Sequence, residues 1–226
     1  MNLLYHLNYI YFSLLITSWF VVSASISTDI QSKRDSSLDC PSAELVSYVN
    51  YNYNNSEISL RTFSCPDLSI QETTGPNTQS LKLSSPARTT SSYRTSSLQG
   101  RNEEQCKTTG DECQCGTASD CTCHGGTTLP PSTNECSILV ASLTVLEEFN
   151  GSSFIVSPGS FVTLSYLTCS FEFINLSTSD IEYCWDELGT ALGLASQQCF
   201  AAATGSAQTC NALDGLWVLQ IFRSFS

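Results

Sequence analysis

The chain has 226 residues, 9 basic against 21 acidic side chains, a net charge of −12 and 12 cysteines. Charged residues make up 13% of the chain, about half the usual quarter. Nucleic-acid binders need clustered basic side chains and binders of anionic membranes need a polybasic run, so this composition argues against both partners. Cytosolic proteins rarely carry so many cysteines unless they bind metal.

The N-terminal segment predicts export. Residues 3–22 are mostly apolar and end at Val22-Ser23-Ala24, a small-residue cleavage site, so we expect residues 1–24 to be a signal peptide and the mature protein to be secreted and extracellular. The alternative is a retained membrane anchor, but polar side chains interrupt the stretch and no second span follows it. We expect no membrane contact after the leader is removed.

A dibasic pair, Lys33-Arg34, follows the leader. It is either a processing site, which would make residues 25–34 a propeptide, or a chance pair in a polar segment.

Four zones follow in chain order. Residues 35–65 form a short segment bounded by Cys40 and Cys65, and the alternation of aromatic residues with Asn over Tyr48–Tyr53 predicts a strand. Residues 66–105 are rich in Ser and Thr and predict a disordered linker. Residues 106–131 predict a cysteine-rich knot that only crosslinks could order, and residues 132–226 are apolar enough to predict a domain with a true core.

The last zone begins with a predicted helix. Ser132 or Thr133 can cap a helix that runs through Cys136 to about Asn150, and Gly151 can end it. Residues 154–157 predict a strand, Pro158-Gly159 a turn, and residues 161–174 one long strand or a pair.

A second helix is predicted over residues 181–199, because apolar side chains recur there at three- and four-residue steps. Asp214-Gly215 predicts a turn into a final strand over residues 216–222. The predicted fold class is α+β: a small antiparallel sheet with two helices, stabilised by disulfides, plus a cysteine-rich N-terminal region.

The even number of cysteines and the secretory context predict six disulfides, although spacing alone leaves their connectivity open. The predicted disulfide cysteines are Cys40, Cys65, Cys106, Cys113, Cys115, Cys121, Cys123, Cys136, Cys169, Cys184, Cys199 and Cys210. Three sequons predict N-glycosylation, at Asn54, Asn150 and Asn175.

The sequence contains few residues that could form a catalytic or metal-binding site. After the leader His124 is the only histidine, and a catalytic Cys would need a free thiolate beside a base. Paired carboxylates could serve a glycosidase, and the available groups are Glu147-Glu148, Asp180 with Glu182, and Asp186-Glu187. The Cys-x-Cys pairs with His124 could hold a soft metal, but structural zinc sites usually space their cysteines by about two to four residues. We therefore expect no catalytic residues, no metal and no cofactor.

Sugar recognition suits the composition better, because aromatic rings stack on sugar faces while Asn and Ser bond to hydroxyls. Candidate carbohydrate-binding residues are Tyr183, Trp185 and Trp217, together with Tyr48, Tyr51 and Tyr53. For Trp185, on the apolar helix stripe, and Trp217, in a β run, a place in the core is the alternative.

The C-terminal zone also carries recurring motifs. Phe154-Ile155-Val156 precedes Pro158-Gly159, and Tyr183-Cys184-Trp185 and Asp214-Gly215-Leu216-Trp217 follow with intervening cysteines. Over roughly residues 130–226 this pattern resembles small secreted cysteine-rich proteins of mushroom-forming fungi. The resemblance implies a lectin-like glycan-binding domain, an α/β sandwich held by disulfides, and transfers no site residues.

The sequence therefore favours a secreted, carbohydrate-binding, lectin-like module that meets glycans or cell-wall polysaccharide outside the cell. One alternative is a non-lectin effector or toxin that binds a host protein. Another is a structural cell-wall protein, with the Ser/Thr segment as a glycosylated spacer.

Overall fold

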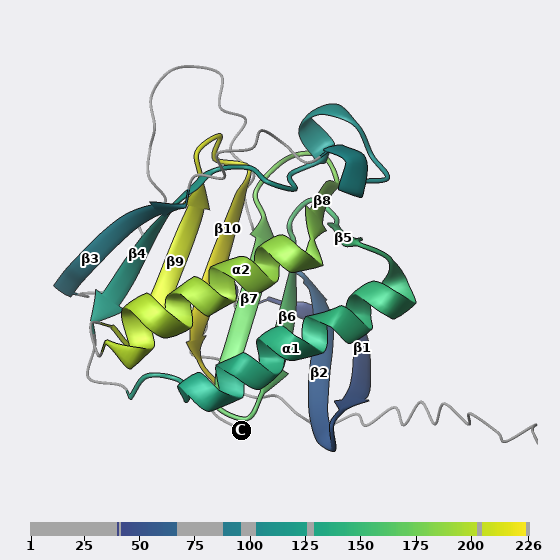
Figure 1. The fold of residues 1–226 in the computed structure, drawn as a ribbon. Coiled ribbons are helices and arrows are strands. Elements are labelled where there is room, and N and C mark those ends of the chain that lie inside the picture. The colour runs from purple at the N-terminus through teal and green to yellow at the C-terminus, as the bar shows by residue number, and fades with distance from the viewer. Residues whose placement is uncertain are drawn as a thin grey trace, which may run out of the picture. The chain divides into compact units, whose positions relative to one another are not determined.

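One antiparallel sheet of eight strands dominates the computed structural model, which describes residues 40, 42–66, 88–95, 103–125, 129–202 and 205–224. The predicted leader and Lys33-Arg34 lie outside the described residues. The strand order is β1-β2-β6-β7-β10-β9-β4-β3 (Figure 1). The strands are Glu44–Tyr53 (β1), Ser56–Ser64 (β2), Arg88–Thr95 (β3), Ser119–Gly125 (β4), Ser160–Tyr166 (β6), Cys169–Asn175 (β7), Ala207–Ala212 (β9) and Trp217–Arg223 (β10).

A second, two-stranded sheet pairs β5 (Ser153–Val156) with β8 (Ile181–Cys184). Two single turns of 3-10 helix are also present: Glu103–Gln105 directly precedes the cysteine-rich segment, and Gly110–Glu112 lies in it. With two α-helices beside the antiparallel sheet, the predicted disulfide-stabilised α+β class is confirmed.

Helices α1 (Thr133–Asn150) and α2 (Trp185–Ala195) cover one face of the large sheet (Figure 1). Their apolar sides and the facing strand residues form the main core. Its members include Ile58, Leu139, Leu143, Leu164, Phe171, Phe173, Leu188, Leu192, Trp217, Leu219 and Ile221. None of the helices in the described part of the chain has both the length and the apolar character needed to cross a membrane.

The opposite face of the sheet has a smaller apolar cluster. Phe63 of β2 stacks on Phe161 of β6, with ring centroids 5.0 Å apart, and Ile174 and Val218 pack with them. Because this cluster and the β2–β6 pairing join residues 42–66 to the sheet, that segment belongs to the same compact unit as the C-terminal part of the chain.

Several predicted elements are present. The strand over Tyr48–Tyr53 lies in β1, the first helix is α1, and residues 161–174 form a pair of strands, β6 and β7. Gly151 ends α1 with a φ of 90°, a conformation that glycine adopts readily. The Ser132 side chain makes no cap hydrogen bond; instead its backbone N–H donates to Thr168 Oγ1 at 3.0 Å.

The second helix begins later than predicted. Residues 181–184 form strand β8, α2 begins at Trp185, and a turn of π-helix, Ser196–Ala201, follows it. All four residues of β8 are buried, so this stretch has no solvent-exposed face whose periodicity would separate a strand from a helix.

The zone boundaries also differ from the prediction. Within residues 66–105, expected to be a disordered linker, the backbone of Arg88–Thr95 forms strand β3 and pairs with β4. Strand β4 in turn pairs with β9, so the cysteine-rich segment continues the large sheet. Backbone pairing thus orders parts of the chain that lack an apolar run.

All twelve cysteines are paired, as predicted. The bridges are Cys40–Cys65, Cys106–Cys113, Cys115–Cys184, Cys121–Cys210, Cys123–Cys199 and Cys136–Cys169. Three of them span 69, 89 and 76 residues and connect the cysteine-rich segment to the C-terminal part. Only Cys106–Cys113 is closed within that segment, so the other crosslinks order it by joining it to the C-terminal part.

The turn between β6 and β7 holds an exposed Leu167 at a φ of 48°. Holding a non-glycine residue in the left-handed region raises the free energy of the folded state by about 1–2 kcal/mol. Glycine removes this strain but also increases the conformational entropy of the unfolded chain, which offsets part of the gain in stability. We expect Leu167→Gly to raise the free energy of unfolding by about 0.5–1 kcal/mol in chemical denaturation.

The control is Thr168→Gly in the same turn, because Thr168 donates its N–H and its hydroxyl to Glu135. This substitution should lower stability. Equal effects of the two glycines would contradict the assignment of strain to Leu167.

Candidate functional site

The outer surface of the β1–β2 hairpin gathers polar side chains that share one face. Direct antiparallel partners place their side chains on the same side of a sheet, and Tyr48 pairs with Arg61, Asn50 with Ser59, and Asn52 with Glu57. We call these six residues the hairpin face. Tyr48 is 45% exposed, and Asn50, Asn52 and Glu57 are also exposed.

The hairpin itself explains this arrangement. Its two-residue turn, Asn54-Asn55, has φ angles of 48° and 65°. Positive φ at both central positions is typical of the turn type that matches strand twist, and Asn tolerates it well. This turn fixes the register, and the register places Arg61 opposite Tyr48.

Two contacts within the hairpin face hold four of its side chains in place. The Arg61 guanidinium carbon lies 5.1 Å from the centroid of the Tyr48 ring, within the range of a cation–π contact. Asn50 Nδ2 donates a hydrogen bond to Glu57 Oε1. The face therefore offers an aromatic ring, amide groups, hydroxyls and a guanidinium, with one basic and one acidic side chain.

Tyr51 and Tyr53 project to the opposite side of β1, where they pack against the main core. The Tyr51 hydroxyl lies 3.1 Å from Ser142 Oγ of α1. Burial raises the pKa of Tyr51 to about 12, although the Ser142 hydrogen bond lowers it in part. Of the three tyrosines suggested by the sequence, only Tyr48 belongs to the hairpin face.

The other sugar-binding candidates are core residues. Tyr183, Trp185 and Trp217 are 4%, 2% and 1% exposed. Ring centroids are 5.1 Å apart between Tyr183 and Trp217, and 4.2 Å apart between Trp185 and Phe154. Their assignment as ligand contacts is wrong, because a sugar cannot stack on a ring whose two faces are already covered by protein.

The predicted site residues did not include Glu57, Ser59 and Arg61, the hairpin partners on β2. The signal that could have found them is the Asn54-Asn55 turn, because a two-residue loop there sets Tyr48 opposite Arg61.

Glu182 of β8 is a buried carboxylate that anchors the cysteine-rich segment. It accepts hydrogen bonds from the backbone N–H groups of Lys107, at 2.8 and 2.9 Å, and Thr108, at 2.6 Å. The hydroxyls of Thr108, at 2.7 Å, and Ser153 also donate to it. Burial alone would raise the pKa of Glu182, but these hydrogen bonds outweigh burial and hold its pKa below the usual range.

These bonds identify Glu182 as a structural acceptor, since every donor around it comes from the protein itself. The other carboxylates considered for hydrolysis include Asp186, which accepts from Gln105 Nε2 at 3.0 Å, and Glu187, whose pKa is raised by burial and by Asp186. Glu147 and Glu148 are exposed on α1.

Glu182→Gln should destabilise the fold at neutral pH by about 2–4 kcal/mol, because the new NH₂ group opposes backbone donors in a buried site. A lowered folded-state pKa contributes stability that is present above the ordinary pKa of 4.5 and is lost as the pH falls through the folded-state value.

The difference in unfolding free energy between wild type and Glu182→Gln should therefore shrink when the pH is lowered below 4.5. Denaturant titrations at several pH values measure this, with the exposed Glu147→Gln as control. A gap that is independent of pH would contradict the role of the charge.

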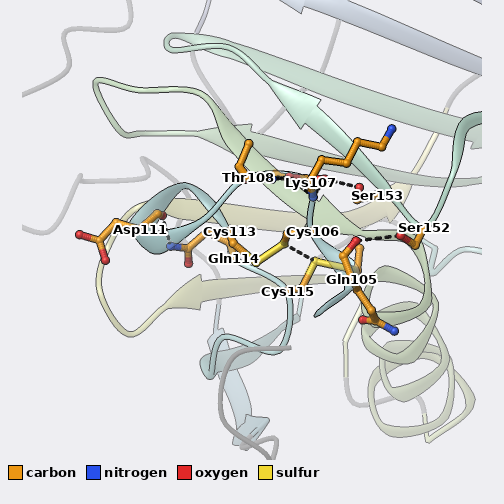
Figure 2. The surroundings of a disulfide bond; sticks show 12 residues. Gln105, Cys106, Lys107, Thr108, Asp111, Cys113, Gln114, Cys115, Ser152 and Ser153 are labelled. Carbon is orange, nitrogen blue, oxygen red and sulfur yellow. Dashed lines mark hydrogen bonds between the residues drawn. A yellow bond between two sulfur atoms is a disulfide. The ribbon is translucent and has the colours of Figure 1, made fainter. Parts of the chain in front are cut away.

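The closest group of potential metal ligands in the described part of the chain is Cys106, Cys113 and Cys115, whose sulfurs lie within 4.8 Å of one another (Figure 2). All three sulfurs are in disulfides, so none is available as a thiolate ligand. His124, which the sequence suggested as a fourth ligand, lies on β4 outside this group, and burial lowers its pKa.

The predicted glycosylation sites differ in access. Asn54 is exposed at the tip of the hairpin and Asn150 at the end of α1. Asn175 is fully buried, and its Nδ2 atom donates to the carbonyls of Val156 at 2.7 Å and Ser179 at 2.8 Å. Because a glycan is attached at Nδ2, a modified Asn175 could not make both bonds, which contradicts its prediction as a glycan site.

Peptide mapping of the protein secreted from a eukaryotic host should find glycans at Asn54 and Asn150 and an unmodified Asn175.

Asn175→Asp should lower the unfolding free energy by about 2–4 kcal/mol, because it removes a buried donor of two hydrogen bonds. Asn134→Asp is the control, because Asn134 is exposed and lies outside the three sequons. A folded protein with a glycan on Asn175 would refute this arrangement.

Comparisons of the chain with models of protein families, with curated proteins and with solved structures found no match.

Proposed function

We propose that the protein is an extracellular glycan-binding protein and that the hairpin face is its binding site. The observation that carries the proposal is the exposed Tyr48 ring beside the exposed amides of Asn50 and Asn52 on one side of an edge hairpin. The predicted signal peptide, the six disulfides and the resemblance of residues 130–226 to secreted fungal proteins support an extracellular role.

Each group on the hairpin face has a role in this proposal. The Tyr48 ring offers a flat apolar surface for the C–H face of a sugar, and its contact with Arg61 holds the ring in position. The Asn amides and the Ser59 hydroxyl both donate and accept, as sugar hydroxyls do. With only Glu57 and Arg61 charged, the face suits a neutral polysaccharide better than a sulfated or phosphorylated one.

Tyr48→Ala should weaken binding to the glycans or insoluble cell-wall polysaccharides that the wild type retains, by roughly tenfold or more, about 1.4 kcal/mol. The control is Val49→Ala, an exposed residue of the same strand whose partner Leu60 packs against the main core on the opposite face. Affinity measured on a glycan array and by sedimentation with polysaccharide tests this.

Wild-type protein that binds no glycan at high concentration would remove the proposal. Equal losses in Tyr48→Ala and Val49→Ala would move the site away from the hairpin face. Both variants should be compared with the Asn54 glycan present and after its enzymatic removal, because Asn54 lies at the tip of the same hairpin.

The edge position of β1 favours a second candidate, a protein partner. Leu45, Val46 and Val49 are 56%, 64% and 53% exposed on this outermost strand, and exposed apolar edges can receive an added strand. This alternative corresponds to an effector that binds a host protein. Capture of one defined partner that survives deglycosylation of that partner would favour it.

A further inference from the structure

Two disulfides of the cysteine-rich segment touch each other. Cys106 Sγ lies 3.2 Å from Cys115 Sγ, and the dashed line in Figure 2 marks this approach. Cys106 is bonded to Cys113, and Cys115 to Cys184. Because neither sulfur carries a proton, the approach is a direct sulfur–sulfur contact and not a hydrogen bond.

The four cysteines of these bridges differ in exposure. Cys113, Cys115 and Cys184 are each 0% exposed, whereas Cys106 is only partly buried. Thiol–disulfide exchange requires a thiolate to reach a sulfur of the bond. A dissolved thiol can therefore attack the first bridge at Cys106, but it cannot reach the second bridge directly.

We propose that this pair is a thiol–disulfide exchange site that takes an external dithiol and passes the reduction from the exposed bridge to the buried one. The inference is independent of glycan binding. Its chemistry requires only the dithiol as co-reactant, which supplies two electrons.

The exchange proceeds in three balanced steps. One thiolate of the dithiol attacks Cys106 Sγ, forms a mixed disulfide and releases Cys113, which takes up a proton. The second thiolate of the dithiol closes the oxidised cyclic disulfide and releases the Cys106 thiolate. That thiolate attacks Cys115 Sγ at 3.2 Å, so the Cys106–Cys115 bond forms, the Cys115–Cys184 bond breaks, and Cys184 leaves and is protonated.

The result is a local loop in place of a long-range link. Cys115–Cys184 spans 69 residues and ties the segment to the start of α2, whereas a Cys106–Cys115 bond closes on the segment itself. The remaining ties of this segment to β8 and β10 include the Glu182 carboxylate, Gln114 N–H to the Glu182 carbonyl at 2.9 Å, and Trp217 Nε1 to Gln114 Oε1 at 3.2 Å. Exchange thus loosens the cysteine-rich segment without unfolding the sheet.

Limited reduction of the secreted full-length protein tests the proposal. The oxidised protein is treated with stoichiometric dithiothreitol, quenched with an alkylating reagent and mapped by mass spectrometry. The expected product has alkylated Cys113 and Cys184, a new Cys106–Cys115 crosslink and intact Cys121–Cys210, Cys123–Cys199 and Cys136–Cys169 bridges, whose cysteines are all buried. Alkylation of Cys106 and Cys113 with Cys115–Cys184 preserved would overturn the proposal, as would earlier opening of Cys136–Cys169.

A variant adds a kinetic readout. In Cys106→Ser/Cys113→Ser the relay is absent, so alkylation of Cys184 under the same dithiothreitol should slow at least tenfold. An unchanged rate in the folded variant would contradict the relay. The map of the wild-type protein decides the question without this variant if the variant does not fold.

Discussion

The long-range disulfides are the constraint on which the rest of the fold depends. Strand β4 is short and polar apart from its cysteines, and Cys121 and Cys123 attach it to Cys210 and Cys199 in the last third of the chain. Closing loops of 89 and 76 residues removes much of the entropy of the unfolded chain, about 4 kcal/mol for each in a chain-entropy estimate. In a chain with so few charges, this stabilisation lets weakly apolar segments extend the sheet from its apolar centre at β6, β7 and β10.

Buried polar side chains also stabilise the fold, because they order loops that the disulfides do not hold. Glu182 satisfies two consecutive backbone N–H groups of the segment that follows Cys106, and Asn175 satisfies two carbonyls, one at the end of β5 and one just before β8. Both side chains are buried, and each would be costly there without its partners. The buried polar side chains thus fix the conformation of backbone segments near the core.

The sequence predicted those parts of the fold in which the hydrophobic periodicity is clear or a capping or turn residue marks the end of an element. Helix α1 has a polar start and Gly151 at its end, and the strand predicted over Tyr48–Tyr53 lies in β1. Strands β8 and β4 were missed for opposite reasons: β8 is buried on all sides, and β4 is held by crosslinks rather than by apolar residues. The pairing of cysteines depends on which strands become neighbours, and that is decided over separations of up to 89 residues.

The site was harder to predict because aromatic residues serve two purposes in this chain. Tyr183, Trp185 and Trp217 supply the large rings of the core between the wide sheet and helices α1 and α2, so they are unavailable to a ligand. Tyr48 is on the outermost strand and projects to the side opposite to Tyr51 and the helices, so it stays exposed. The Cys40–Cys65 bridge flanks this hairpin, whereas the touching sulfurs tie a different segment to β8 and α2. Since separate links hold the two regions, a change of the sulfur pair can leave the hairpin face intact, and each region can be altered on its own.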